Sequence, residues 1–354
     1  MREELERLRK EIDQIDADIL LRLNRRAQIA QRIGELKQGA IYRPEREAQI
    51  LKRLISENRG PLEGESVGRV FREIMSACLA LEQALRIAHL GPPGTFSESA
   101  VRKHFGGAPE LSPLATIDDV FRAVEAGNVD YGVVPVENST EGTVGRTLDL
   151  LLATPLLICG EVELRIHQNL MSKAESVGGL KRLYSHGQSL AQCHEWLNRN
   201  VPNLVRIPVA SNAEAARLAS EDAESAAVAG EAAAKLCGLN ILAQSIEDDP
   251  NNTTRFLVLG RHDAGLSGDD KTSFVCSAQN RPGAMHALLE PLASKRVSMT
   301  KLESRPSRAG LWEYVFYVDI QGHQDDPAVA EALTELRDKA AFLKILGSYP
   351  CAIV

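Results

Sequence analysis

Basic side chains gather near the start of the sequence, together with carboxylates that could share a pocket with them. The first 88 residues hold 17 Lys and Arg against 15 Asp and Glu, although the whole chain carries a net charge of −7. The basic candidates for binding an anion are Arg9, Arg26, Lys37 and Arg46, and the carboxylates that could share their pocket are Glu47 and Glu82. A charge on a long helix usually lies in solvent, so a solvated surface is the competing interpretation for each arginine.

Polar residues also follow several apolar stretches farther along the chain, where the strands of a sheet would end. They are Thr95 and Ser97 in "GPPGTFSESA", Asn138 and Ser139 in "VPVENSTEGTV", Ser185, His186 and Gln188 in "LYSHGQS", and Thr254, Arg255 and Phe256 in "TTRFLVLG". Strand ends in an open α/β sheet form a binding crevice. A turn or a helix cap is the competing interpretation for each segment taken alone.

The first of these segments has the form of an anion site. Thr95 and Glu98, three residues apart, predict a capping box, and the free backbone N–H groups of that helix would face an anion. Neither the P-loop nor the G-x-G-x-x-G signature is present, so a nucleotide is not the expected ligand. Arg255 could add a charged donor or form a salt bridge at its strand end. His186 could act as an acid or bond its own loop.

Composition excludes several classes of protein. A chain of 354 residues is expected to form about two or three domains. No apolar run is long enough to cross a membrane, and the charged N-terminus does not resemble a signal peptide, so the cytoplasm is the expected location. The six cysteines form no C-x-x-C pair, which favours free thiols, and no metal or other cofactor is expected. The net negative charge disfavours binding to nucleic acid.

The elements that position the first group of residues are helices. Apolar residues recur every three or four positions from Leu5 to Leu36, which predicts one helix of about 50 Å. Pro44 can start a second helix over 44–58, and 64–85 has the pattern of a third. Arg9 and Arg26 would lie about 25 Å apart on the long helix, too far to hold one small ligand together. We therefore expect a three-helix unit that pairs with a second copy of itself, so that Arg26 of the partner reaches the site.

Residues 86–262 alternate between short apolar stretches and helical patterns, which predicts a mainly parallel α/β sheet, and their length favours two lobes with a cleft between them. The expected strands are 87–90, 131–136, 183–185, 205–209, 226–229 and 256–259, and the expected helices are 96–105, 117–126, 189–199, 212–220 and 230–237. After a polar linker, residues 272–350 predict a compact β-α-β-β-α-β unit.

Residues 1–88 resemble the all-helical chorismate mutase family, through "LRKEIDQIDADILLRLNRRAQIAQRIGELK", "YRPEREAQIL" and "FREIMSACLALEQ". The resemblance implies an intertwined dimer in which Arg9 and Arg26 hold the two carboxylates of chorismate. It implies that Lys37 faces the ether oxygen and that Arg46 and Glu47 complete the pocket. The rearrangement needs only the compact conformer and a stabilised ether oxygen. Arg43 stands where some members carry an acid, and Glu82 where some carry Gln. We expect Glu82 to act only when it is neutral, because only a protonated carboxyl can donate a hydrogen bond.

Residues 86–262 resemble prephenate dehydratase, through "GPPGTFSESA", "VPVENSTEGTV" and "TTRFLVLG". The resemblance implies two lobes like those of a periplasmic binding protein, with prephenate between them, and assigns catalysis to Thr254. The anion expected near Thr95 is then a carboxylate of prephenate. A threonine hydroxyl is a poor acid, so Thr254 is expected to be an oriented donor backed by a relay, with His186 as the alternative acid.

Residues 272–350 resemble the ACT domain, a regulatory module that binds amino acids. One effector motif is intact at Glu303, Ser304, Arg305 and Pro306, and the other is altered to Gly283, Ala284, Met285 and His286. The resemblance implies that phenylalanine binds between ACT domains and closes the dehydratase cleft. The competing interpretation is a β-α turn and a sheet edge that only forms dimers.

The expected organisation is therefore a chorismate mutase domain over 1–85, a dehydratase domain over 86–262 and an ACT domain over 271–354. The expected function is conversion of chorismate to prephenate and then to phenylpyruvate, with feedback inhibition by phenylalanine. Two alternatives remain open at this point. One is a metabolite-sensing binding protein without catalysis, and the other is a dehydratase whose mutase is weak or lost.

Overall fold

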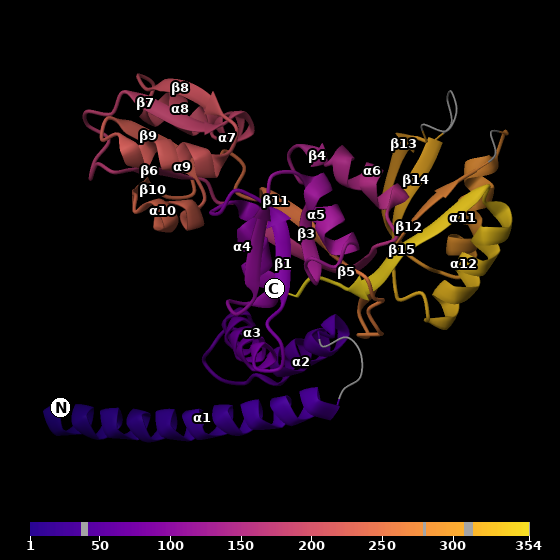
Figure 1. Cartoon of the computed structure of the whole chain (residues 1–354), viewed down its shortest axis with the longest axis horizontal. Helices are drawn as coiled ribbons and strands as arrows, with labels where there is room; N and C mark the ends of the chain where they lie inside the picture. The colour runs from indigo at the N-terminus through magenta and orange to yellow at the C-terminus, as the bar shows by residue number, and fades with distance from the viewer. Residues whose placement is uncertain (37–41, 279–280, 308–313, 354) are drawn as a thin grey trace.

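The computed structural model describes residues 1–36, 42–278, 281–307 and 314–353. The chain starts with three helices, then forms two α/β lobes, and ends with a third sheet that carries two helices (Figure 1). None of the helices within these described ranges is long and apolar enough to cross a lipid bilayer. The multidomain organisation expected from the sequence is confirmed.

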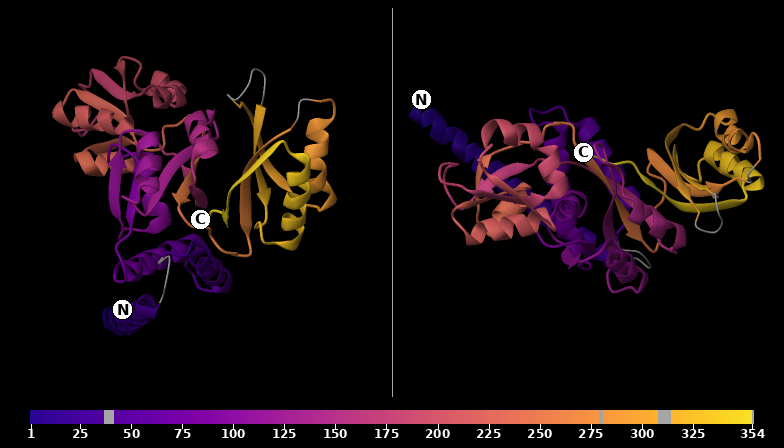
Figure 2. Two further views of the ribbon diagram at one scale, coloured as in Figure 1. Left: turned by 45° about the vertical axis from the view of Figure 1, so that its right-hand side comes forward. Right: turned by 90° about the horizontal axis from the view of Figure 1, so that it is seen from above.

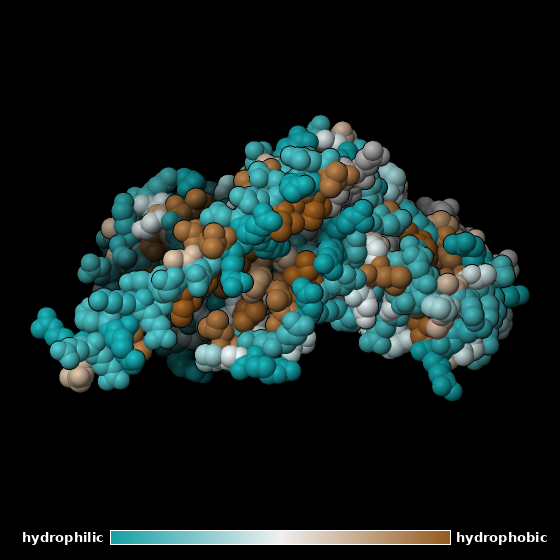
Figure 3. Space-filling view, turned by 90° about the horizontal axis from the view of Figure 1, so that it is seen from below, coloured by the Kyte–Doolittle hydropathy of each residue, from teal (hydrophilic) through white to brown (hydrophobic). Residues whose placement is uncertain are grey.

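The N-terminal helices form at the expected places: α1 (Arg2–Leu36), α2 (Pro44–Glu57) and α3 (Gly64–Ala80). Helix α1 lies along one side of the other two and buries none of its residues (Figure 1). Its exposed apolar side chains are Leu5, Leu8, Ile12, Ile15, Ile19, Leu20, Leu21, Ile29, Ile33 and Leu36. Figure 3 shows this underside of the molecule, with apolar side chains in brown between hydrophilic ones. A stripe of this length is typical of an interface and not of a solvated helix.

The first α/β lobe is built on a six-stranded sheet of order β2-β1-β3-β11-β5, with β4 paired to β3. Its strands are β1 (Arg86–Leu90), β2 (Glu110–Leu114), β3 (Tyr131–Asn138), β4 (Gly142–Thr143), β5 (Leu157–Arg165) and β11 (Thr253–Gly260). Its helices are α4 (Phe96–Phe105), α5 (Ile117–Glu125) and α6 (Gly145–Ala153). Alternate residues of β3 face opposite cores: Val133 packs with α4, and Val134 packs with α5 and α6.

The second lobe is built on a five-stranded sheet of order β10-β6-β9-β7-β8. Its strands are β6 (Asn169–Ser172), β7 (Arg182–His186), β8 (Val205–Val209), β9 (Ser225–Ala229) and β10 (Asn240–Ala243). Its helices are α7 (Gly187–Gln192), α8 (His194–Asn200), α9 (Asn212–Glu221) and α10 (Glu231–Cys237). The chain enters this lobe after β5 and leaves it before β11, so the two lobes expected from the sequence are confirmed. A hydrogen bond from Ile166 N to Asn252 O, 2.8 Å long, joins the two crossing segments.

The prediction of mainly parallel sheets is wrong. In the first lobe only β2, β1 and β3 run parallel, because β11 pairs antiparallel with both β3 and β5. In the second lobe β6 runs antiparallel to β9 and β10. The strands that cause this mixture are mostly those at the crossings, where the chain passes between lobes without an intervening helix. Sequence periodicity does not report strand direction.

The C-terminal unit has the expected β-α-β-β-α-β order. Its elements are β12 (Asp270–Ser277), α11 (Ala284–Ser294), β13 (Met299–Pro306), β14 (Tyr314–Gln321), α12 (Pro327–Lys339) and β15 (Phe342–Pro350). The sheet has the order β13-β14-β12-β15 and buries one face under α11 and α12. Its other face shares a core with the first lobe, which therefore lies between the second lobe and this sheet (Figure 2).

A glycine makes this contact between units possible. Gly347 of β15 has a φ of +150°, and a Cβ there would lie 2.3 Å from the carbonyl oxygen of Ile158 on β5. A backbone cannot approach another backbone this closely when a side chain stands between them. Gly347 therefore fixes how closely the C-terminal sheet can pack on the first lobe.

Candidate functional site

The first candidate site lies at the ends of β3 and β11, where the first lobe meets the segments that cross to the second. Asn138 ends β3 and is buried, and it lies opposite Thr254 in the antiparallel register. Asn138 Nδ2 donates a 2.8 Å hydrogen bond to Thr254 Oγ1 and another of 2.8 Å to Asn252 Oδ1. Asn138 Oδ1 accepts from Thr140 and Glu141, which fixes the amide orientation. The Thr254 oxygen is thus an acceptor, so its own O–H remains available as a donor.

Polar side chains continue from this pair towards the second lobe. Asn252 Nδ2 donates to Gln192 Oε1 at 3.1 Å, and Gln192 Nε2 donates to Thr140 Oγ1 at 3.2 Å. Gln168, on the segment that crosses from β5 to β6, donates to Ser189 Oγ at 2.9 Å. Its buried Oε1 has no hydrogen-bond partner within the described part of the chain. A buried amide oxygen without a partner is costly, so this atom is suited to accept from a bound molecule.

The chain of hydrogen bonds ends on the second lobe. Asn212 Nδ2 donates to Ser189 Oγ at 2.8 Å, and Asn212 Oδ1 accepts from Ser185 Oγ at 3.1 Å and from His186 N at 3.1 Å. His186 Nδ1 accepts from Gln188 N at 3.4 Å. His186 therefore bonds its own loop, which is one of the two roles that the sequence left open for it. The structure connects Asn138, Thr254, Ser185 and His186 through amides that bridge the lobes.

The turn before α4 has a different arrangement from the predicted capping box. Thr95 Oγ1 donates to Leu90 O at 3.0 Å and makes no cap bond, and Glu98 accepts from Gly94 N instead of from Thr95 N. The prediction is wrong because the threonine hydroxyl fastens the turn to β1. Ser97 is buried in the first turn of α4. No hydrogen bond among the described residues joins Thr95 or Ser97 to the Asn138–Thr254 pair.

The same turn nevertheless borders the second lobe. Gly94 packs on α10, since a Cβ there would lie 3.2 Å from Ala233 Cα. Phe96 at the start of α4 abuts Gly230 just before α10, where a Cβ would lie 2.8 Å from the ring. Any change in the angle between the lobes would therefore move this turn against α10.

A cleft of about 220 Å³ opens beside the Asn252–Gln192 bond, and acidic residues border it. The charges of Glu247 and Asp248 are engaged locally. Glu247 accepts from His167 Nδ1 and from Gln168 N. Asp248 accepts from two N–H groups in the first turn of α8, those of Glu195 and Trp196. These acids therefore serve as helix caps and loop braces, and an anion would have to be held by amides, hydroxyls and backbone N–H groups.

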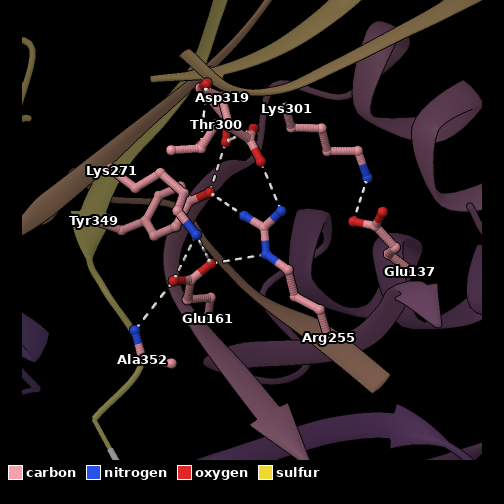
Figure 4. A network of polar contacts seen from close by, with 10 residues as sticks. Glu137, Glu161, Arg255, Lys271, Thr300, Lys301, Asp319, Tyr349 and Ala352 are labelled. Carbon is pink, nitrogen blue, oxygen red and sulfur yellow. Dashed lines mark hydrogen bonds and ion pairs between the residues drawn. The ribbon is translucent and has the colours of Figure 1, made fainter. Parts of the chain in front are cut away.

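Two residues of "TTRF" do not face the crevice. Arg255 Nε donates to Glu161 at 2.8 Å, and its terminal nitrogens donate to Asp319 at 2.6 Å and to the Tyr349 hydroxyl at 2.9 Å (Figure 4). The salt-bridge interpretation holds for Arg255, and the prediction that it binds substrate is wrong. The prediction is also wrong for Phe256, which is 2% exposed and packs in the core beneath α4. Residues two apart on a strand share a face, so Phe256 lies one layer deeper than Thr254.

Serine 139 has a structural role as well as its place beside the crevice. Ser139 Oγ accepts from Thr253 N at 3.0 Å, and Ser139 N donates to Thr253 O at 2.9 Å. These two bonds close the end of the β3–β11 ladder. They hold Asn138 and Thr254 opposite each other.

The second candidate site lies among the N-terminal helices. Glu47 on α2 is largely buried, and burial raises the pKa of its carboxyl from 4.5 to about 7, against the opposing charges of Arg72 and Arg26. The positive charge of Arg26 therefore reaches Glu47 within one chain. Arg9 lies far along α1, exposed and paired only with Glu6 in the described structure. Within one chain it is therefore Arg26, and not Arg9, whose charge acts on Glu47.

The other predicted residues of this site are Glu82, Arg46 and Lys37, and they differ in their surroundings. Glu82 follows α3 and packs on Gly34 of α1, where a Cβ would lie 2.9 Å from the carboxylate side chain. Its buried Oε2 lacks a hydrogen-bond partner within the described residues. Arg46 is exposed on α2, and Lys37 lies outside the described residues.

The predicted effector residues fall on two elements of the C-terminal unit. Gly283 precedes α11 with a φ of +78°, and Ala284, Met285 and His286 form its first turn. The residues Glu303, Ser304, Arg305 and Pro306 lie at the end of β13, the edge strand of its sheet. Arg305 pairs with Asp149 of α6 at 3.0 Å, so it already contacts the first lobe.

Sequence reasoning missed the residues that join the sites. Asn252, Gln192, Gln168 and Asn212 lie in no recognised motif, because they act by bridging segments that are distant in sequence. Arg72 is buried in α3 and pairs with Glu47 at 3.8 Å. A signal for Arg72 existed, since it shares the helical spacing of the buried residues of α3.

Comparison with known proteins finds one family model for the helical unit, one for the two-lobed unit and one for the C-terminal unit. The family model "Chorismate mutase type II" matches residues 8–83, "Prephenate dehydratase" matches 87–264, and "ACT domain" matches 272–338. A bifunctional chorismate mutase/prephenate dehydratase of Neisseria gonorrhoeae is 56% identical over 350 residues, covering 98% of this chain and 97% of its own. The corresponding protein of Pseudomonas aeruginosa is 48% identical and covers 99% of both chains.

A solved structure extends the likeness to three dimensions. The prephenate dehydratase of Arthrobacter aurescens, in complex with L-Phe, matches with a TM-score of 0.70 and 34% identity, over 75% of this chain and 90% of that one. The helical unit, the two-lobed unit and the C-terminal module define a multidomain enzyme with a regulatory domain. The chain belongs to the family of bifunctional chorismate mutase/prephenate dehydratases, and its two enzyme domains are those of a mutase and a dehydratase.

Proposed function

We propose that this enzyme rearranges chorismate to prephenate, converts prephenate to phenylpyruvate, and is inhibited by L-phenylalanine. The observation that carries the dehydratase assignment is the Thr254 hydroxyl, which accepts from Asn138 where the two lobes meet. The names of the relatives and the three family models support the pair of activities.

The dehydration needs little from the protein because the product ring is aromatic. The bond to the departing carboxylate breaks, and its electron pair enters the ring as the C–O bond to the hydroxyl breaks. The hydroxyl leaves as water once it has received a proton, and the carboxylate leaves as CO₂. In this proposal the Thr254 O–H donates a hydrogen bond to the leaving oxygen, since its own oxygen is held by Asn138, and the proton that completes the water comes from solvent, relayed through this hydroxyl. Ser185 and His186 close the site from the second lobe.

The mutase proposal requires two copies of the chain. The exposed apolar stripe of α1 supports a homodimer in which the long helices pack together. Arg26 and Glu47 are contributed by one subunit, and Arg9 is contributed by the other. The two arginines then bind the carboxylates of chorismate, and Glu82, with an unpartnered buried oxygen, reaches the ether oxygen. The dimer would be a cytoplasmic enzyme, in keeping with six free cysteines.

The regulatory proposal rests on the ACT domain and on the L-Phe complex of the Arthrobacter protein. Phenylalanine would bind at the start of α11 and the end of β13, where the two effector motifs lie. Met285 and His286 stand where the family's Gly-Ala-Leu-Val motif has leucine and valine, so the first motif here carries a thioether and an imidazole. Binding must favour one state of the dehydratase over another for inhibition to result.

One assay on the purified protein tests the whole proposal. Chorismate is supplied with and without L-phenylalanine, and prephenate and phenylpyruvate are followed by ultraviolet absorption. Thr254→Ala is expected to lose phenylpyruvate formation while prephenate still accumulates. Thr253→Ala is the matched control, because its hydroxyl bonds only the Asn251 carbonyl in the described structure. Near-full dehydratase activity in Thr254→Ala would remove this residue from catalysis, and tight binding without any turnover would identify a sensor instead.

A further inference from the structure

The two strands that carry Asn138 and Thr254 present a second pair of residues to the opposite face. Asn138 lies opposite Thr254, and the preceding residue Glu137 lies opposite Arg255. Side chains of consecutive residues in a strand point to opposite faces, whereas directly opposed residues share a face. Asn138 and Thr254 therefore form the front pair in the crevice, and Glu137 and Arg255 form the rear pair.

A bulge in β3 directs Glu137, one member of the rear pair, towards the ACT domain. Arg255 is opposite Glu137 but Phe256 is opposite Pro135, so one residue of β3, Val136, has no counterpart. Bulges re-aim the side chains beyond them and are frequent beside active sites. Here the bulge turns Glu137 to the face that the C-terminal sheet covers.

The ACT domain holds both members of the rear pair by charge. Lys301 of β13 donates to Glu137 at 2.6 Å, and Asp319 of β14 accepts from Arg255 at 2.6 Å (Figure 4). Lys301, Arg255 and Asp319 are largely buried, although the Glu137 side chain is 38% exposed. Arg255 Nε also donates to Glu161 Oε2 of β5 at 2.8 Å. Charge-assisted hydrogen bonds of this length are strong and directional, so the rear pair must follow any movement of the sheet.

The strand that carries Lys301 also carries an effector motif. Along β13, Lys301, Glu303 and Arg305 are partly covered, and the residues between them are exposed. The covered face is the one that contacts the first lobe, through Lys301 with Glu137 and Arg305 with Asp149. A ligand that displaces the end of β13 therefore moves the same strand that holds Glu137.

We propose that Lys301 and Asp319 are positioning residues through which the ACT domain sets the geometry of the Asn138–Thr254 pair. Their partners, Glu137 and Arg255, are the chain neighbours of Asn138 and Thr254 and lie on the opposite face of the same two strands. Displacement of the sheet by an effector pulls Glu137 and Arg255 and so turns Asn138 and Thr254 out of register with the second lobe. The inference rests on the proposed inhibition by L-phenylalanine.

The test separates binding of the effector from its effect on turnover. Lys301→Met and Asp319→Asn remove one rear contact each, and neither residue belongs to the catalytic site or to the effector motifs. Affinity for L-phenylalanine is measured by calorimetry on the full chain, and prephenate turnover is measured with and without L-phenylalanine. The control is Lys339→Met, which breaks an ion pair with Glu290 between the two ACT helices, away from the dehydratase.

The expected result is that both variants bind L-phenylalanine within about threefold of the wild type, while inhibition weakens at least about tenfold. By linkage, prephenate should then no longer alter their affinity for L-phenylalanine. The Lys339→Met control should be inhibited like the wild type. Lys301→Glu should lose inhibition, and adding Glu137→Lys should restore it by rebuilding the pair with reversed charges.

Several outcomes would overturn the inference. Folded Lys301→Met and Asp319→Asn proteins that are inhibited as strongly as the wild type would show that the rear pair does not couple the domains. Loss of L-phenylalanine binding in these variants would place the residues in the effector site instead. Failure of the reversed pair to recover inhibition would remove the Lys301–Glu137 contact from the pathway. A wild type that L-phenylalanine does not inhibit would refute the proposed function and not this coupling.

Discussion

Glu47 provides a test of the helical site that depends on pH. Burial raises the pKa of this carboxyl from 4.5 to about 7, and the charges of Arg72 and Arg26 only partly oppose that rise. Between pH 4.5 and about pH 7, the folded protein therefore keeps a proton on this carboxyl that the unfolded chain has released. The contribution of this carboxyl to the free energy of unfolding is greatest below about pH 4.5, where both states are protonated. It decreases as pH rises towards 7, because the unfolded chain ionises first, and it does not change at higher pH.

The magnitude follows from the size of the rise. Each unit of pKa corresponds to about 1.4 kcal/mol, so the shift corresponds to a loss of about 3 kcal/mol between the two limits. Glutamine has the shape of the protonated carboxyl and cannot ionise. Glu47→Gln should therefore match the wild type near pH 4.5 and exceed its local free energy of unfolding by up to about 3 kcal/mol at pH 8.

Hydrogen exchange of peptides from α2 and α3 measures this quantity locally, which suits a chain of several domains. His104, which lines the same junction, has a pKa lowered to about 3 by burial and by Arg72, so it opposes the slope on the acid side. Comparison of wild type and variant at each pH cancels its contribution. Glu57→Gln, at the exposed end of α2, is the control. A Glu47→Gln protein with the wild-type pH slope, or one less stable at pH 8, would refute the reasoning.

Three further predictions concern Glu82, the pair Arg9 and Arg26, and Gly347. Glu82→Gln should keep mutase activity and Glu82→Ala should lose it, because an amide can donate a hydrogen bond to the ether oxygen and a methyl group cannot; an alanine variant with wild-type steady-state rates counts against this role. Arg9→Ala and Arg26→Ala proteins should each lose mutase activity, and a mixture refolded together should regain part of it, because one site of the mixed dimer has both arginines; a mixture as inactive as its components contradicts the shared site. Gly347→Ala should lower the temperature of unfolding or free the ACT domain from the first lobe, since its Cβ would overlap Ile158 O, and calorimetry that shows no change would exclude this close approach.

The sequence was most informative where local patterns decide the structure. The spacing of apolar residues predicts α1 nearly to its ends, and Pro44 marks the start of α2. The polar residues after β3 and before β11 were expected to meet, and Asn138 and Thr254 do form a hydrogen bond. Strand ends that carry a polar residue after an apolar run are detectable because both signals lie within a few residues.

The parts that were missed depend on contacts between distant segments. Strands β2, β5, β6 and β10 and helix α6 were not predicted, and β5 contains charged residues that suggest a surface segment until its partners are known. Glu137 faces the ACT domain because of a bulge in β3 that no local pattern announces. The bridging amides Asn252 and Gln192 follow no spacing rule, since these two bonded residues lie 60 positions apart in the sequence.

A single buried carboxylate shows how far the three units are joined. Glu161 is 3% exposed, and its oxygens accept from Arg255 of the dehydratase, from Lys271 of the ACT domain and from Ala352 N of the C-terminal segment. The next residue, Ile353, accepts from the guanidinium of Arg72 in α3.

A charge taken out of water is tolerated only while its partners remain in place, so loss of any one of them raises the free energy of the whole junction. The last residues of the chain are thereby fixed between the dehydratase and the mutase helices. A change in the ACT sheet that moves Lys271 must disturb the carboxylate that also holds Arg255 beside Thr254. The same carboxylate anchors the segment that contacts Arg72, the partner of Glu47, so the mutase helices are mechanically part of the same junction.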